Sequence, residues 1–226
     1  MSSLRHKIVG TGIRLRAIFQ FLTQRLRRLG RHVLQFCWAR PQWWVELVYL
    51  LLDVFGLPEI YETLVDWIKW NTRPLHTEEI ALLRPIFGNS IDYRRVRIDE
   101  RAFLGPPQWH ICYVSFYTIN AWRPMGPDLL IHEVVHVWQF QQLGSVYIPR
   151  ALQAQRSAMG YNYGGAPALV NHVRAGGQLT DFNLEQQADI VADYWRLQHG
   201  LRPHWPPAGP ADFFAYAYLV EEIAEV

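Results

Sequence analysis

Two histidines and a glutamate stand together in the segment LIHEVVHVWQF, residues 130–140. If this segment is helical, His132 and His136 lie on one face, because residues four apart are stacked one turn above the other. Two imidazole nitrogens placed in this way can bind one zinc ion (Zn2+), and Glu133 can act as general base toward a water molecule that the ion holds. The spacing therefore predicts a zinc-dependent hydrolase with Glu133 as its catalytic residue.

A catalytic zinc site needs a third protein ligand. One known solution places another histidine further along the same segment, but Gln139 and Gln142 occupy those positions. The later segment NLEQQADIVADYW, residues 183–195, instead offers Glu185 and Asp189 on one helical face. We expect Glu185 to bind the metal and Asp189 to accept a hydrogen bond from the far nitrogen of a ligand histidine. Weaker substitutes for the acidic ligand are Asp181 and Asp193.

A peptide hydrolase also needs a donor for the negatively charged oxygen that develops in the transition state. Three side chains between the two predicted helices qualify by type: Tyr161, Tyr163 and His172. The sequence does not choose among them.

The two segments carry the end signals of helices. We expect a helix from Asp128, as its N-cap, to Leu143, with Gly144 ending it. A second helix is expected from Asn183 through His199, because Asn183 and Gln186 form the pattern of a capping box. These helices are the scaffold on which the predicted metal ligands depend.

The first part of the chain is basic and amphipathic. Residues 1–45 contain nine Lys and Arg and no acidic residue, whereas the rest has 13 basic and 20 acidic residues. An apolar stripe over residues 15–36 predicts one helix with arginines on its other faces. Such a helix either lies on an anionic membrane, through residues 1–42, or packs on its own domain, and the sequence does not separate the two. One or two further helices are expected over residues 41–70, with a break at residues 56–58.

A small sheet is also predicted. Residues 91–99 and 111–120 alternate enough to form strands, and a short helix capped by Thr77 is expected before them, ending near Gly88. The fold class is therefore α+β and mostly helical, with a small sheet beside the active-site helix. We expect three parts: a basic helical segment (1–72), the catalytic domain (73–200), and a proline-rich connector with a C-terminal helix (201–226).

Several classes of protein are disfavoured by composition. Two cysteines, Cys37 and Cys112, cannot make a disulfide framework or a four-thiolate metal site. The arginines could indicate a protein that binds nucleic acid, but the sequence contains no recognised motif that reads bases, so we do not expect a nucleic-acid partner. No signal peptide or membrane-spanning helix is evident, which favours a cytoplasmic protein, or one exported without a signal peptide, that could lie peripherally on a membrane.

Three stretches together resemble a known family. LHTEEIALLRPIFGNSIDYRRVRID (75–99), LIHEVVHVWQFQ (130–141) and FNLEQQADIVADYW (182–195) are similar to the Vgr-related, zincin-like metallopeptidases of bacteria. The resemblance implies a gluzincin-like domain with His132, His136 and Glu185 as zinc ligands, Glu133 as base and a peptide or protein substrate. Proteins of this group are associated with secretion systems or toxins, and the basic first 70 residues have no counterpart in the resemblance. The alternative function is a catalytically inactive zinc-binding or membrane-associated interaction module.

Overall fold

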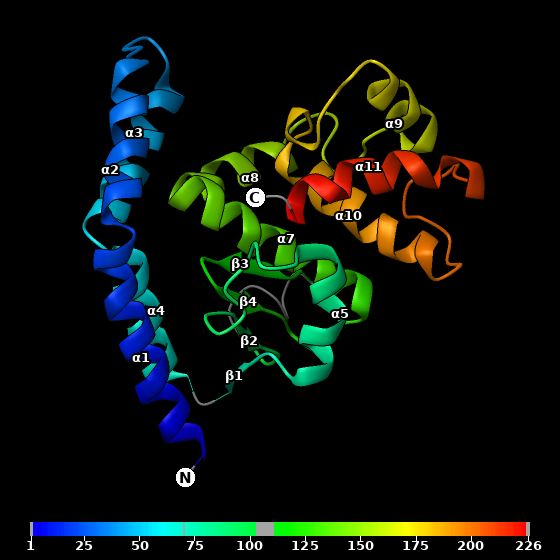
Figure 1. Ribbon diagram of the computed structural model, residues 1–226. Helices are drawn as coiled ribbons and strands as arrows, with labels where there is room; N and C mark the ends of the chain where they lie inside the picture. Colours follow the sequence, from blue (N-terminus) through cyan, green and yellow to red (C-terminus); the bar gives the residue numbers. More distant parts are fainter. Residues whose placement is uncertain (1, 70, 103–110, 225–226) are drawn as a thin grey trace. The chain divides into compact units, whose positions relative to one another are not determined.

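The computed structural model describes residues 2–69, 71–102 and 111–224 (Figure 1). It is mostly helical with a small sheet, as expected for the α+β class. The chain forms two compact units that interleave in sequence. Unit 1 comprises Met1–Leu75, Tyr93–Arg123 and Gln139–Pro149, and unit 2 comprises His76–Asp92, Pro124–Trp138 and Arg150–Val226. The predicted N-terminal segment 1–72 lies within unit 1.

Four helices form the N-terminal part of unit 1. They are α1 (Ser2–Gln20), α2 (Leu22–Leu34), α3 (Pro41–Val54) and α4 (Leu57–Ile68). The single helix expected over 15–36 is wrong in its bounds, because the helical region begins at Ser2 and divides at Phe21. Gly10 lowers the helix propensity of the first stretch, and an added Cβ would lie 2.8 Å from the Arg97 guanidinium, so a larger residue here would displace that side chain. The predicted break at 56–58 is confirmed, since Gly56 adopts a left-handed conformation (φ 68°) between α3 and α4.

The helices of unit 1 pack in pairs, α1 against α4 and α2 against α3, and the second pair continues from the end of the first (Figure 1). Acidic side chains of α4 face the arginines of the first two helices. Arg14 pairs with Asp66 at 2.9 Å and Arg25 with Glu59 at 2.5 Å, all four side chains being buried. One face of the basic segment therefore packs on its own unit, as one of the two interpretations predicted.

The sheet of unit 1 has four strands among the described residues, in the order β1-β2-β4-β3. β1 (Thr72–Pro74) runs antiparallel to β2 (Arg97–Asp99), β2 is parallel to β4 (Thr118–Asn120), and β4 is antiparallel to β3 (Tyr113–Ser115). In the central pair Ile98 faces Ile119, and both are fully buried. The short 3-10 turn η1 (Gly144–Val146) packs against α3 in the same unit.

The two predicted strands are shorter than expected. Residues 93–95 form a turn, which directs Arg95 to Glu59 (3.0 Å) and to the Tyr117 hydroxyl (2.9 Å), so only 97–99 pair as a strand. Residues 111–120 are not one strand but the hairpin of β3 and β4. Its turn has Phe116 at φ 60°, a conformation that glycine or asparagine usually adopts. No turn signal in the sequence marks it.

Unit 2 is built from helices. They are α5 (Thr77–Phe87), the first part of α7 (Pro127–Leu143), the main part of α8 (Tyr147–Gln155), α9 (Gly165–Arg174), α10 (Leu184–Gln198) and α11 (Phe213–Ala224). The short turns η2 (Leu179–Asp181) and η3 (Pro210–Asp212) link them. Helix α11 packs against α5, α9 and α10, which gives this unit its core (Figure 1). No helix within the described ranges is long and apolar enough to cross a membrane.

The N-caps of two helices differ from the sequence prediction. Thr77 is the first residue of α5, and His76 is its N-cap; the Glu79 carboxylate accepts a hydrogen bond from the His76 N–H at 2.7 Å. Helix α7 begins at Pro127, so Asp128 lies in its first turn rather than at the cap. Proline is favoured in this position because its missing N–H has no partner to lose there. The Asp128 carboxylate instead forms an ion pair with Arg196 of α10.

Candidate metal centre

Helix α7 carries the first two candidate ligands. It spans Pro127–Leu143, and Gly144 follows with φ 73°, as predicted for the residue that ends it. Apolar residues of the motif segment are fully buried, including Ile131, Val134 and Val135. The intervening positions hold His132, Glu133 and His136, which are also largely removed from solvent. The imidazole rings of the two histidines lie 5.0 Å apart between centroids.

Helix α10 carries the third candidate ligand. The predicted capping box is confirmed: the Asn183 side chain accepts hydrogen bonds from the N–H groups of Glu185 (3.0 Å) and Gln186 (2.9 Å), and Gln186 returns one to Asn183 N–H (3.1 Å). This cap sets the start of the helix and therefore the direction of Glu185, which lies in its first turn. Glu185 is 1% exposed, an unusual degree of burial for a carboxylate without a function or a partner.

The three side chains meet at one point. Glu185 Oε2 lies 3.4 Å from His136 Nε2 and 3.6 Å from His132 Nε2, and the three ligand atoms are all within 4.8 Å of one another. Two atoms bound to one zinc ion at about 2.0–2.1 Å in tetrahedral geometry are about 3.3–3.4 Å apart. The two separations from Glu185 Oε2 are close to that distance. Among the residues that the structure describes, this is the group of His, Cys, Asp and Glu able to hold a metal ion.

The bonding of Glu185 also fits a cation. Its Oε1 accepts a hydrogen bond from the Gln155 side chain at 2.9 Å, whereas Oε2 is buried without a hydrogen-bond donor. A buried carboxylate oxygen without a donor is costly unless a positive charge faces it. Burial opposes ionisation, but the two imidazoles overcome this and lower the pKa of Glu185 well below its usual range. The carboxylate is therefore ionised and directed at the two histidine nitrogens.

Asp189 fixes the orientation of His132. Its Oδ1 lies 2.8 Å from His132 Nδ1, and its Oδ2 accepts a hydrogen bond from the Trp205 indole N–H at 2.6 Å. With a proton on Nδ1, the Nε2 lone pair of His132 is available on the side of Glu185, as a ligand histidine requires. Burial lowers the pKa of His132, but the neighbouring carboxylates of Asp189 and Glu185 have the larger effect and raise it to about 10. A metal ion must therefore displace a proton to bind.

Glu133 lies beside the ligands, not among them. It is 4% exposed, and its Oε2 is buried without a hydrogen-bond partner. Burial raises the pKa of Glu133, and the positive charges of the two histidines only partly offset this. A carboxylate with a raised pKa can take a proton from water and release it later, which is the property of a general base that then acts as a general acid.

Of the three candidate oxyanion donors, the structure brings Tyr161 to the cluster. Its ring stacks on His132, with 6.0 Å between the ring centroids, and its hydroxyl lies near enough to Glu185 for this carboxylate to raise the pKa of Tyr161. Burial, followed by the nearby carboxylates, raises the pKa of Tyr161, so that it keeps its proton and can donate.

Tyr163 and His172 make other contacts. The Tyr163 hydroxyl donates to Asp193 at 2.6 Å and lies 2.9 Å from the Tyr216 hydroxyl, while His172 contacts the Gln178 carbonyl at 3.1 Å. The two weaker acidic candidates are engaged as well. Asp193 accepts the backbone N–H of His204 at 2.6 Å, and Asp181 lies 3.3 Å from His172.

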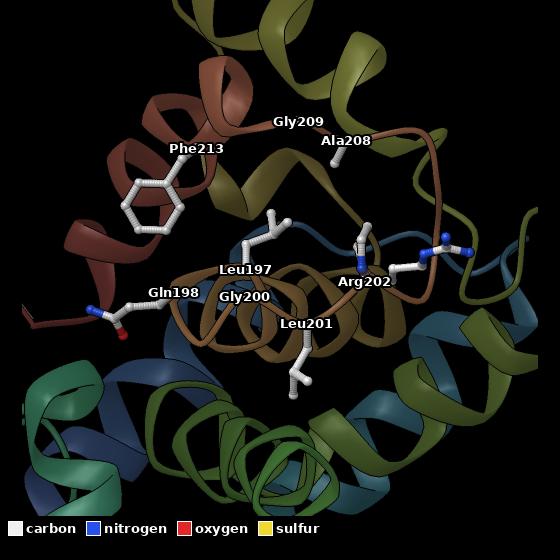
Figure 2. Close-up of a pocket in the computed structure, with 9 residues that line it drawn as sticks. Leu197, Gln198, Gly200, Leu201, Arg202, Ala208, Gly209 and Phe213 are labelled. Atoms are coloured by element: carbon white, nitrogen blue, oxygen red, sulfur yellow. The ribbon is translucent and has the colours of Figure 1, made fainter.

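Two contributors were not predicted from the sequence. Gln155, at the end of α8, holds Glu185, and Trp205, in the proline-rich connector, holds Asp189. Neither belongs to a motif, and no spacing in the sequence points to them. The same connector lines a cavity of about 580 Å³, together with the end of α10 and Phe213. Figure 2 shows Leu197 and Phe213 on its walls; the metal-ligand cluster is not part of its lining.

Comparison with known proteins gives one informative match. The chain is 34% identical over 138 residues to the type VI secretion system spike protein VgrG2b of Pseudomonas aeruginosa (strain PAO1). The match covers 54% of this chain and 13% of that protein, so the chain is related to a small part of a VgrG spike protein. No protein-family profile matches the sequence. No solved structure matches it either.

Proposed function

We propose that this protein is a zinc-dependent metallopeptidase of the zincin type. The observation that carries the proposal is the convergence of His132, His136 and Glu185, with Glu185 Oε2 at 3.4 and 3.6 Å from the two histidine nitrogens. Two nitrogens and one carboxylate oxygen form the donor set of a catalytic zinc site that leaves a position open. Zinc bound there would act as a Lewis acid, which lowers the pKa of water and polarises a peptide carbonyl.

The residues around this position have distinct tasks in the proposed reaction. Glu133 takes a proton from the attacking water as its oxygen bonds to the carbonyl carbon, and then delivers that proton to the leaving amine nitrogen as the C–N bond breaks. Tyr161 donates a hydrogen bond to the negatively charged carbonyl oxygen. Asp189 keeps His132 in the tautomer that presents Nε2.

The relationship to VgrG2b favours a role connected with a secretion system, because that name is of a type VI spike protein. The substrate would then be a peptide or protein that is present where a type VI secretion spike acts.

The test begins with metal content. Protein purified without chelators should contain about one zinc per chain, and His132→Ala should lose it. A proteome-derived peptide mixture, analysed by mass spectrometry, should then show cleavage by the wild type and none by Glu133→Gln, which keeps the metal. Glu221→Gln, on the exposed side of α11, is the matched control.

The outcomes separate the alternatives. Protein without zinc whose properties are unchanged by His132→Ala contradicts the metal site itself. Stoichiometric zinc without cleavage of any peptide favours the alternative, an inactive zinc-binding interaction module. Cleavage that persists in Glu133→Gln shows that Glu133 is not the base.

A further inference from the structure

The helices α1–α4 bury their carboxylates. Residues 1–69 contain five acidic side chains, and all five lie inside unit 1 with exposed fractions of 8% or less: Glu46, Asp53, Glu59, Glu62 and Asp66. Acidic residues are ordinarily among the most exposed in a protein. These five residues lie on α3 and α4, and Arg14 of α1 and Arg25 of α2 are buried with them, so the side of each helix that carries these charges faces inward.

Buried cations and donors compensate these carboxylates. Glu59 pairs with Arg25 (2.5 Å) and Arg95 (3.0 Å), and Arg14 lies between Asp66 (2.9 Å) and Glu62 (3.8 Å).

The Asp53 carboxylate is stabilised by uncharged hydrogen-bond donors. It accepts hydrogen bonds from the Ser145 N–H at 2.8 Å and from the Ser145 hydroxyl at 2.5 Å. The interior of this helical layer is thus a polar network of carboxylates, arginines and uncharged hydrogen-bond donors.

The outward faces carry apolar residues instead. On α3 the exposed positions Trp44, Val48, Leu51 and Phe55 recur at helical spacing, and Phe55 is 70% exposed. The other three helices show the same pattern, with exposed positions that include Leu4, Ile8, Leu15 and Phe19 on α1, Leu26, Val33 and Leu34 on α2, and Leu57, Tyr61, Leu64 and Ile68 on α4. An exposed apolar surface of this extent marks a site of interaction.

The charge on these outward faces has one sign. The exposed charged side chains of α1, α2 and the following turn are Arg5, Arg16, Arg27, Arg31 and Arg40. Because the five carboxylates are inside, residues 4–69 present arginines, apolar residues and exposed tryptophans such as Trp38, Trp44 and Trp67. The surface therefore complements a partner that is both apolar and anionic.

We propose that the outward face of α1–α4 binds the surface of an anionic phospholipid bilayer. Arginines contact lipid phosphates, leucines and phenylalanines enter the boundary with the acyl chains, and the indoles lie at the level of the headgroups. A second copy of this chain fits less well, since pairing the same face would bring arginines against arginines. This membrane face is independent of the metal centre in unit 2.

The direct test is co-sedimentation of the full chain with vesicles. The probes are vesicles of phosphatidylcholine alone and of phosphatidylcholine with three-tenths phosphatidylglycerol. We expect binding to the anionic vesicles, weakened by salt, and little binding to the neutral ones. The triple variant Arg16→Gln/Arg27→Gln/Arg31→Gln should lower the partition coefficient by on the order of 100-fold, at about fivefold for each arginine.

An apolar triple variant tests insertion separately. Leu34, Phe55 and Ile68 are 87%, 70% and 73% exposed, so changing each to glutamine removes little packing in the folded protein. We expect a loss of about tenfold or more per side chain, because each buries apolar area in the bilayer. Brominated lipids should quench the tryptophan fluorescence of the wild type and not that of this variant.

The control replaces Leu201, Phe214 and Tyr218, which are 45–47% exposed in unit 2, with glutamine and should leave binding unchanged. Circular dichroism establishes that each variant is folded. Failure to bind anionic vesicles, or binding that both triple variants retain, overturns the proposal. A dimer in light scattering that the apolar triple variant dissociates also overturns it, and assigns the face to a contact between copies.

Discussion

The hydrogen bond between Asp189 and His132 provides a quantitative test of the metal centre. Asp189→Ala removes the acceptor that lies 2.8 Å from His132 Nδ1. Nothing then holds the imidazole in the tautomer and orientation that directs Nε2 toward Glu185. Loss of such a partner to a ligand histidine weakens metal affinity by about 10–100-fold, which corresponds to about 1.4–2.7 kcal/mol of binding free energy.

The same carboxylate has a second bond, and this permits a matched comparison. Trp205 donates its indole N–H to Asp189 Oδ2 at 2.6 Å, whereas His132 faces the other oxygen, Oδ1. Trp205→Phe removes that bond and keeps the one to the histidine. We expect it to weaken zinc binding by less than about 10-fold, because the first contact of the ligand is intact.

The measurement is competition for zinc with a chelating chromophore at fixed pH, supported by thermal unfolding of the metal-free proteins. Asp181→Ala is the control, since Asp181 lies near His172 and its side chain is 54% exposed. Zinc affinity of Asp189→Ala equal to that of the wild type, with the fold intact, would refute the role assigned to Asp189. If Asp189→Ala and Trp205→Phe lose the same amount of zinc affinity, then the contact with the proline-rich connector, and not the tautomer of His132, determines how tightly zinc binds.

Two further predictions concern other residues. Tyr161→Phe should lower kcat by about 10²–10³-fold on any cleaved peptide while zinc affinity is unchanged, and Tyr218→Phe should have no effect. Burial raises the pKa of Glu62 from 4.5 to about 7, so the folded state binds this proton more tightly than the unfolded state. Stability should therefore fall by about 3 kcal/mol as pH rises from 4.5 to 8, and urea unfolding of Glu62→Gln should lack that contribution. A pH dependence of the variant identical to that of the wild type contradicts this assignment.

The sequence alone was sufficient where the signal is local. The two histidines, Glu133, and the capping box that begins α10 depend on spacings of three or four residues, and such spacings determine which side chains share a helical face. The break at Gly56 and the mostly helical α+β class follow from equally local patterns. For the same reason the sequence predicted that Glu185 and Asp189 lie on one face of a helix.

The tertiary structure decided what depends on residues far apart in the chain. That Glu185 lies within 3.4–3.6 Å of both histidines required two helices to pack, and the contacts of Gln155 and Trp205 arise from segments without a motif. The strand bounds were wrong for two reasons. Residues 93–95 form a turn in which Arg95 reaches the distant Glu59, and the β3–β4 turn has Phe116 at a positive φ that local propensity does not favour. The sequence showed the N-terminal arginines as an excess of positive charge. Only packing showed that Arg14 and Arg25 are matched by buried carboxylates, which leaves the opposite face apolar and cationic.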